Sequence, residues 1–149
     1  ELLDQAGLLR GLLKHSGHEV RRRRSPPKFQ VRNTALISAL GAYSFDEARM
    51  DRSYWGRLVE SAVGAHLCNA TDANLRIGYW REGSLEVDFV LGNGRQLVAI
   101  EVKSGKSAGS LPGLGEFSRR NEGCRMLVVG GEEVPVGEFL RYPVAHWLE

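Results

Sequence analysis

The stretch that decides the fold runs Ser84-Leu-Glu-Val-Asp-Phe-Val-Leu91, then Gly92-Asn-Gly-Arg95, then Gln96-Leu-Val-Ala-Ile-Glu-Val-Lys103. The two outer segments alternate apolar and polar residues, which is typical of strands with one buried face. The middle segment has two glycines and an asparagine, which is typical of a hairpin loop. We therefore predict two antiparallel strands, Leu85–Leu91 and Gln96–Lys103, joined by a short turn.

Three charged side chains, Asp88, Glu101 and Lys103, lie on these predicted strands. Because side chains alternate between the two faces of a strand, Glu101 and Lys103 point the same way. Ionised groups beside a buried sheet are costly unless they bind something. A divalent metal ion together with a phosphate group would satisfy all three side chains.

The register of the hairpin decides whether Asp88 joins the other two. If Leu91 pairs with Gln96, or if that pairing moves by two residues, Asp88 shares a face with Glu101 and Lys103. A shift of one residue would turn Asp88 away. The same registers place the apolar residues together on the opposite face, namely Leu85, Val87, Phe89, Leu91, Val98, Ile100 and Val102. The apolar pattern and the charged cluster therefore demand the same register.

At these residues the chain resembles the PD-(D/E)XK nucleases, which have the restriction-endonuclease-like fold. Asp88 followed by Glu101-Val102-Lys103 is similar to the Asp…Glu-x-Lys core of that superfamily, and Glu60 resembles the helical acidic residue that precedes it. From about Leu8 to Trp147 the chain is also similar to an uncharacterised domain usually found behind an AAA+ ATPase module in archaeal and bacterial proteins. That domain more typically has an Asp-x-Gly-Leu type of segment at positions 33–36.

The resemblance implies a metal-dependent domain that hydrolyses phosphodiester bonds, with DNA as the expected substrate. Asp88, Glu101 and the backbone carbonyl of Val102 would bind Mg²⁺ or Mn²⁺, because hard cations prefer oxygen ligands. Lys103 would orient the attacking water, help to deprotonate it, or offset charge on the phosphate. Glu60 would hold a water molecule or a second metal ion.

Other functions stay open on the residues alone. Asp88, Glu101 and Lys103 are also compatible with an ordinary cross-strand salt-bridge set on a solvated face. In that case the domain would only bind nucleic acid, regulate the ATPase or dock another protein. Glu86 either borders the site or pairs with a nearby arginine. Nucleic-acid contacts are expected from the basic residues Arg21, Arg22, Arg23, Arg24 and Lys106.

Composition is that of an ordinary globular domain. The chain has 149 residues, 42% of them hydrophobic, and a formal net charge of +2, which points to no particular partner. It lacks the 18-residue apolar run of a membrane helix. It also lacks a phosphate-binding P-loop motif, so the ATPase module that the resemblance implies would lie upstream in a longer chain. The histidines are scattered, and Cys68 and Cys124 have the pattern of reduced thiols in a cytoplasmic protein.

The order of the remaining patterns predicts a mixed α/β sheet flanked by helices. Helices are expected at Leu2–Lys14, Thr34–Leu40, Asp51–Cys68 and Leu111–Asn121, and further strands at Leu75–Arg81 and Arg125–Val129. The last strand should run parallel to Gln96–Lys103, and Val144–Leu148 should form a short strand or helix. An antiparallel turn is expected between 18–24 and 28–32. We predict an N-terminal helix and basic hairpin over 1–41, for which fold analogy alone suggests the remnant of a winged helix, followed by a restriction-endonuclease-like domain over 42–149.

Overall fold

The computed structural model describes residues 2–16, 25–70, 74–105 and 110–149. Its strands are β1 (Leu9–Lys14), β2 (Lys28–Val31), β3 (Arg76–Glu82), β4 (Leu85–Gly92), β5 (Leu97–Lys103) and β6 (Arg125–Gly130). Its helices are α1 (Leu2–Gln5), α3 (Ala35–Leu40), α4 (Phe45–Met50), α5 (Arg52–Cys68), α6 (Pro112–Arg120), α7 (Val136–Arg141) and the 3₁₀ helix η1 (Val144–Leu148). In this described part, no helix is both long and apolar enough to cross a lipid bilayer.

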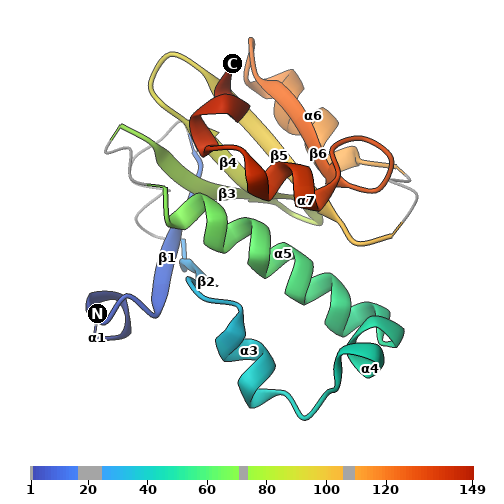
Figure 1. Ribbon diagram of the computed structural model, residues 1–149. Coiled ribbons are helices and arrows are strands. Elements are labelled where there is room, and N and C mark those ends of the chain that lie inside the picture. The colour runs from blue at the N-terminus through green and yellow to red at the C-terminus, as the bar shows by residue number, and fades with distance from the viewer. Residues whose placement is uncertain (1, 17–24, 71–73, 106–109) are drawn as a thin grey trace.

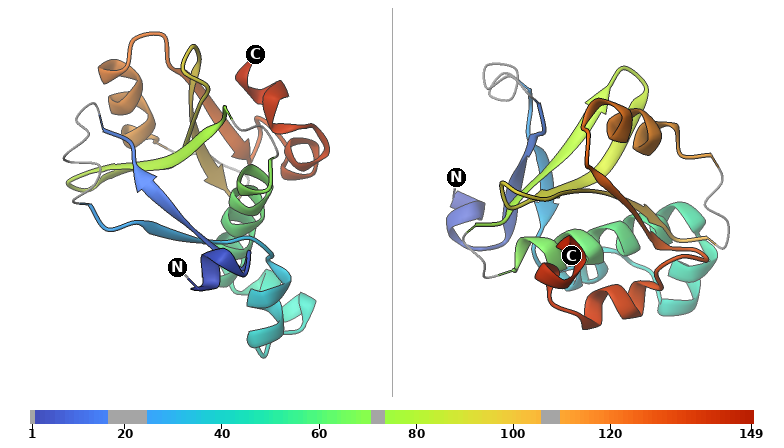
Figure 2. Two further views of the ribbon diagram at one scale, coloured as in Figure 1. Left: turned by 90° about the vertical axis from the view of Figure 1, so that its left-hand side faces the viewer. Right: turned by 90° about the horizontal axis from the view of Figure 1, so that it is seen from above.

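The strands form one mixed sheet in the order β2-β1-β3-β4-β5-β6, as traced in Figure 1. Helices α5 and α7 cover one face of this sheet, and α6 covers the other (Figure 2). Strand β5 pairs with β6 in parallel through the α6 crossover. The mixed α/β fold expected from the sequence is therefore confirmed.

The β4–β5 hairpin has the predicted register after a shift of two residues. Leu91 pairs with Val98, and Phe89 pairs with Ile100. The turn is stabilised by Asn93, whose side-chain oxygen accepts hydrogen bonds from two backbone N–H groups, at 3.0 Å from Arg95 and 2.8 Å from Gln96. Local turn chemistry of this kind is why the hairpin could be read from the sequence.

A β-bulge interrupts the alternation that the sequence suggested for β4. Gly78 of β3 pairs with Val90, but Trp80 pairs with Val87, so two residues of β4 lie opposite one residue of β3. Val87 consequently packs with Trp80 on the α6 face, whereas Phe89 packs on the α5 face. The prediction that Leu85 and Val87 share a face with Phe89 and Leu91 was wrong, because a bulge adds a residue and reverses the alternation beyond it.

The prediction of a helix over Leu2–Lys14 was also wrong. The helix α1 ends at Gln5, Gly7 adopts a positive φ of 69°, and the chain continues as strand β1. Strand β1 is antiparallel to β2 and parallel to β3 at Leu13 and Lys14. These hydrogen bonds outweigh a weak helical preference, because propensity is easily overridden by tertiary pairing.

Strand β2 forms where the arm at 28–32 was predicted, and it pairs with β1. Residues 18–24, the other predicted arm, lie outside the described residues, so the turn between the two arms stays a prediction. The division of the chain into 1–41 and 42–149 stays a prediction. The sheet itself continues across it, because β1 and β2 lie on the first side and β3 to β6 on the second.

The helices were predicted well where local signals were strong. Helix α5 begins after Asp51, whose carboxylate accepts from the N–H groups of Ser53 and Tyr54 at 3.0 Å each. Helices α3 and α6 also match. Helix α4 was not predicted, although Ser44 and Glu47 form a capping box, which is a recognisable start signal.

Gly64 of α5 allows β2 and β4 to approach the helix closely. A Cβ atom at Gly64 would lie 2.8 Å from the Phe89 ring and would also overlap the side chain of Gln30. Gln30 is buried and donates from Nε2 to the backbone oxygen of Ser61 at 3.0 Å. This contact holds β2 against α5 and so fixes the position of the preceding residue pair, Lys28 and Phe29, relative to the helix.

Candidate functional site

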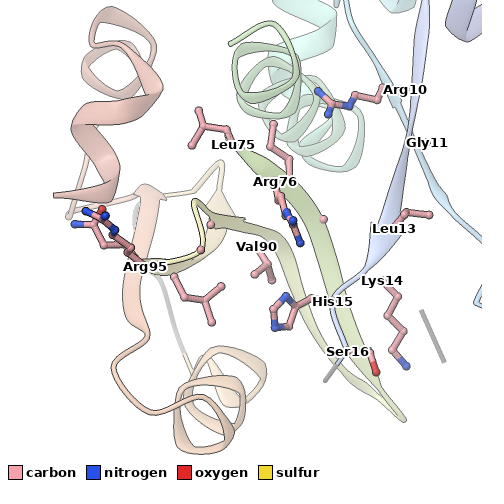
Figure 3. Close-up of a pocket in the computed structure, with 16 residues that line it drawn as sticks. Arg10, Gly11, Leu13, Lys14, His15, Ser16, Leu75, Arg76, Val90 and Arg95 are labelled. Carbon is pink, nitrogen blue, oxygen red and sulfur yellow. The ribbon is translucent and has the colours of Figure 1, made fainter. Parts of the chain in front are cut away.

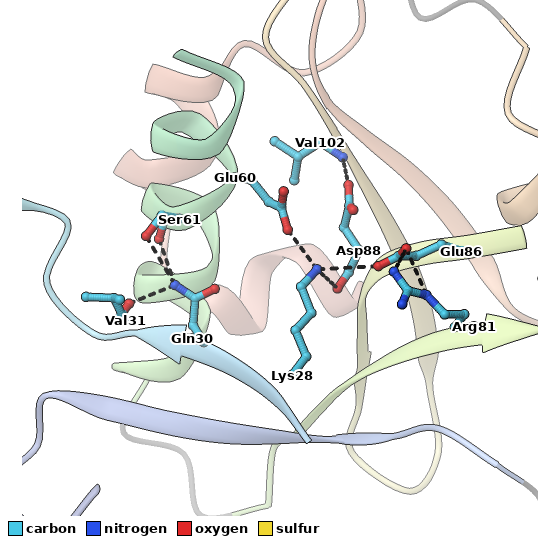
Figure 4. A network of polar contacts seen from close by, with 9 residues as sticks. All are labelled: Lys28, Gln30, Val31, Glu60, Ser61, Arg81, Glu86, Asp88 and Val102. Carbon is cyan, nitrogen blue, oxygen red and sulfur yellow. Dashed lines mark hydrogen bonds and ion pairs between the residues drawn. The ribbon is translucent and has the colours of Figure 1, made fainter. Parts of the chain in front are cut away.

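Carboxylates from three elements gather where β4 and β5 separate. They are Glu60 of α5, Asp88 of β4 and Glu101 of β5, which are the acidic residues singled out in the sequence. Figure 4 shows Glu60 and Asp88 on either side of Lys28, with Glu86 beside them. The electrostatic influence of both Glu60 and Glu101 reaches the Asp88 carboxylate, so the fold brings the predicted acids into one neighbourhood.

The bulge turns the Asp88 side chain toward β5. The ladder between β4 and β5 ends at the pair Phe89 and Ile100. Beyond it, the Asp88 carboxylate accepts a hydrogen bond of 2.8 Å from the backbone N–H of Val102. In a continuous ladder the Val102 N–H would donate to a backbone carbonyl of β4, but here it donates to the Asp88 carboxylate. Asp88 is therefore held between the strands by backbone geometry, not by the simple alternation of faces that the sequence suggested.

The environment of Asp88 favours its protonated form. Burial, together with repulsion by Glu101 and Glu60, raises the pKa of Asp88 to about 7. The Val102 N–H and the Lys28 ammonium lower this pKa, but they do not offset the burial. A buried carboxyl group next to other carboxylates gains stability when a cation arrives.

Glu101 and Lys103 lie on the same side of β5, as their spacing predicted. The Nζ of Lys103 donates to Oε1 of Glu101 at 2.8 Å. Only 16% of the Glu101 side chain is exposed, against 29% of the Lys103 side chain. The lysine therefore neutralises a largely buried carboxylate.

Lys28 is a member of the cluster that the sequence reasoning missed. Its Nζ lies 2.7 Å from Oε1 of Glu60 and 3.8 Å from Oε1 of Glu86. It also donates to the backbone oxygen of Asp88 at 3.5 Å and stands 5.2 Å from the centre of the Phe89 ring. No local signal marks Lys28, because its place depends on the pairing of β2 with β1 and on the contact of β2 with α5.

Glu86 pairs with both Arg81 and Lys28, so the predicted arginine partner is present. Within the described residues, each of Glu60, Glu86 and Glu101 has a cationic partner within 4 Å, and Asp88 has none. Asp88 is thus the acid whose charge is left unbalanced when it ionises. This imbalance is a chemical reason for the cluster to accept one more positive charge.

The residues suit a hard divalent cation by chemistry, but they do not form a preassembled cage. Across the described ranges, no group of three or more His, Cys, Asp or Glu side chains is arranged to hold a metal ion. Asp88 and Glu101 offer oxygen ligands in a mostly buried setting, as Mg²⁺ and Mn²⁺ require. Glu60 would have to leave Lys28 to become a third ligand. The Val102 carbonyl stays a predicted ligand.

The remaining predicted contacts lie elsewhere. Arg21, Arg22, Arg23, Arg24 and Lys106 all fall outside the described residues, so their nucleic-acid contacts stay predictions. Tyr79 and Trp80 are 7% and 5% exposed, so they pack in the core and offer no stacking surface. Cys68 and Cys124 are free thiols, as expected.

Stability should depend on the ionisation of Asp88 in a direction unusual for an acid. Its pKa is higher in the folded state than the ordinary 3.8, so the folded protein retains a proton that the unfolded chain loses. The free energy of unfolding should therefore fall as the pH rises from about 4 to about 7, by up to about 4 kcal/mol. We expect Asp88→Asn to be more stable than the wild type at pH 8 and similar to it at pH 4, as measured by urea unfolding. Equal stability of the two proteins at both pH values would contradict this assignment.

A comparison with known protein families gives one match. The family model described as a domain of unknown function (DUF4143) matches residues 55–146, which span α5 through η1 and include Glu60, Asp88, Glu101 and Lys103. No protein of curated function and no solved structure matches the chain significantly. Since the matched range covers more than half of the 149 residues, this chain belongs to the DUF4143 family.

Proposed function

We propose that this domain is a divalent-metal-dependent phosphodiesterase that cleaves nucleic acid, with DNA as the expected substrate. The single observation that carries the proposal is Asp88: a buried carboxyl group with a pKa near 7, beside Glu101 and without a cationic partner among the described residues. The resemblance to PD-(D/E)XK nucleases at Asp88, Glu101 and Lys103 supports the same conclusion. Members of that superfamily place such residues around one catalytic cation.

In this proposal Asp88 and Glu101 bind the cation, which is Mg²⁺ or Mn²⁺. When bound, a divalent cation supplies Lewis-acid chemistry that stabilises the charge developing on the phosphate. The Val102 N–H holds the Asp88 carboxylate in place through a 2.8 Å hydrogen bond. Burial of Glu101 restricts its motion and strengthens its attraction for a cation.

Lys103 has two roles at different stages. Before the cation binds, it neutralises Glu101. Once Glu101 is occupied, the Lys103 ammonium is released to orient the attacking water or to offset charge on the phosphate. Glu60 and Lys28 form a second pair on the opposite side of Asp88, where Glu60 can hold a water molecule. We also propose, from the resemblance, that the domain acts with an AAA+ ATPase module in the same protein.

Binding of Mn²⁺ should release a proton, because Asp88 must ionise to act as a ligand. Because the pKa of Asp88 is about 7, the affinity for Mn²⁺ should increase about tenfold for each unit by which the pH is raised toward 7. Above pH 7 the affinity should level off. Isothermal titration calorimetry at pH 6, in buffers of different ionisation enthalpy, should detect the release of about one proton.

Cleavage of single- and double-stranded DNA and RNA by the wild type should require Mg²⁺ or Mn²⁺ and stop in EDTA.

The matched control for the titration is Glu116→Gln. Glu116 is also a carboxylate paired with basic side chains, Arg119 and Arg120, but it lies on α6 away from the cluster. It should bind Mn²⁺ like the wild type, whereas Asp88→Asn should show no heat of binding. A wild type that neither binds Mn²⁺ nor cleaves any of the substrates would overturn the proposed function.

A second candidate function is a non-catalytic domain that binds nucleic acid or regulates the ATPase. The observation that favours it is the short ion pair of 2.7 Å between Lys28 and Glu60, which occupies one of the acids with a cation of the chain itself. In this case the cluster would be structural. The calorimetric titration separates the two functions, because a structural cluster would bind no Mn²⁺ at any pH.

A further inference from the structure

Strand β1 separates from β3 and leaves a hollow of about 700 Å³ (Figure 3). Strand β1 pairs with β2 from Leu9 to Leu12, but with β3 only at Leu13 and Lys14. Before Leu13 the two strands therefore diverge. The hollow is completed by the end of β4 and by the turn that leads into β5. Its volume lies in the range of sites that hold small organic molecules, about 300–1,000 Å³.

Basic side chains from three segments line the hollow. Arg10, Lys14, Arg76 and Arg95 belong to its lining, and the described residues that line it include neither Asp nor Glu. The whole chain has 20 Lys and Arg residues and 18 Asp and Glu residues. The excess of positive charge at the hollow is therefore a local feature and does not reflect the overall composition. Figure 3 shows that the three arginines belong to three different segments. In the described part of the chain, none of the four forms an ion pair with a carboxylate.

Gathering four cations around one hollow costs energy unless an anion offsets their repulsion. The planar guanidinium group of arginine binds phosphate oxygens through two parallel hydrogen bonds, and three of the four cations are arginines. Arg10 is partly immobilised already, since its Nη1 donates to the backbone oxygen of Cys68 at 3.2 Å. A ligand with more than one negative charge, or a chain of phosphates, suits this arrangement best.

The lining also includes apolar and aromatic side chains, beside the polar Ser16 and Gln96. Leu13, Val90 and Leu97 contribute alkyl groups, and His15 contributes a ring that packs edge-to-face on Phe117 with 5.3 Å between the ring centres. Charged groups around an apolar surface suit a ligand that combines phosphate with a flat, weakly polar ring. A nucleotide unit has this combination, whereas inorganic phosphate alone would leave the apolar surface unused.

We propose that this cationic hollow binds nucleotide units through their phosphates, as a segment of a single nucleic-acid strand. The choice of a polymer over a free nucleotide rests on the proposed function, while the phosphate chemistry rests on the hollow alone. None of the residues that line the hollow belongs to the acidic cluster around Asp88. The hollow would thus hold the strand at a place separate from the bond that is cut.

The test is binding of a fluorescent 20-nucleotide oligothymidylate, measured by anisotropy in EDTA so that the acidic cluster takes no metal. The variant Arg76→Gln/Arg95→Gln removes two exposed charges from the hollow. The matched control, Arg57→Gln/Arg141→Gln, removes two exposed charges from the helices α5 and α7. The hollow variant should bind the oligonucleotide at least about tenfold more weakly. The slope of log K against log salt concentration should decrease in magnitude by about 1.4, because two phosphate contacts are lost. The control should change by less than about twofold.

Parallel titrations with AMP and ATP distinguish the two sources of phosphate. If the wild type binds ATP but not the oligonucleotide, and the hollow variant loses ATP binding, the hollow is a phosphate site. The part of the proposal that names a nucleic-acid strand as the ligand would then be wrong. Equal losses in the hollow variant and the control, or no binding of any of these ligands by the wild type, would overturn the proposal. A wild type that binds the oligonucleotide but cleaves no nucleic acid would refute the proposed function. It would not contradict the proposed binding of phosphate in the hollow.

Discussion

Replacing Asp88 by Asn, or Glu101 by Gln, should lower Mn²⁺-dependent cleavage about 10³-fold or more. Each change keeps the shape of the side chain and removes one negative charge that the cation needs. A factor of 10³ in kcat/KM corresponds to about 4 kcal/mol of lost transition-state stabilisation. Asp88→Asn should keep its hydrogen bond from the Val102 N–H, because the amide oxygen can still accept it. The loss would then reflect chemistry and not unfolding.

The control for these two variants is Glu82→Gln. Glu82 is an exposed carboxylate on β3 whose nearest cation is Arg120, at 3.7 Å. Its loss changes the net charge by the same amount and should alter cleavage by less than about twofold. Wild-type rates in both Asp88→Asn and Glu101→Gln, with Mn²⁺ present and the fold intact by circular dichroism, would show that these carboxylates do not bind a catalytic cation.

Lys103→Met separates metal binding from the chemical step. Without the lysine, Glu101 loses its partner at 2.8 Å and should bind Mn²⁺ at least as tightly as before. Cleavage should still fall by roughly 10²–10⁴-fold, the usual contribution of a group that assists proton transfer. A parallel loss of Mn²⁺ affinity would instead mean that Lys103 only maintains the site.

Gly113→Ala should cause a large loss of stability. Gly113 is buried in the first turn of α6, and a Cβ atom there would lie 2.9 Å from the carbonyl carbon and 3.0 Å from the amide nitrogen of Glu86, and would overlap its carbonyl oxygen. Backbone cannot move aside as a side chain can, so the helix must shift away from β4. We expect a loss of about 3 kcal/mol and a drop in Tm of about 6–12 °C.

Gly115→Ala, two residues further along the same helix, is the matched control. A Cβ atom at Gly115 meets nothing within 4 Å, so alanine should be neutral or stabilise the helix by up to about 1 kcal/mol. Opposite signs for the two substitutions in thermal unfolding would confirm that α6 rests directly on the β4 backbone. If both stabilise the protein, the close contact at Glu86 does not exist in solution. Since Asp88 lies two residues beyond Glu86, Gly113→Ala should also weaken Mn²⁺ binding.

The elements that carry the acidic residues could be predicted because local patterns mark each of them. The period-two pattern of β5 puts Glu101 and Lys103 on one side, and their 2.8 Å ion pair agrees with it. The hairpin and the cap at Asp51 are also local features, and they position Asp88 and Glu60 on adjacent elements. Short-range signals of this kind involve neighbours in the chain, so they are readable without the fold.

The sequence by itself determined the mixed sheet, the hairpin that carries Asp88 and Glu101, and the helix that carries Glu60, because each arises from patterns of a few neighbouring residues. Only the tertiary structure decided that Leu9–Lys14 is a strand, that a bulge turns Asp88 toward the Val102 N–H, and that Lys28 lies against Glu60. These three features depend on contacts between segments far apart in the chain. The energies of such contacts add to local preference and can reverse it, so they become visible only when the partners are in place.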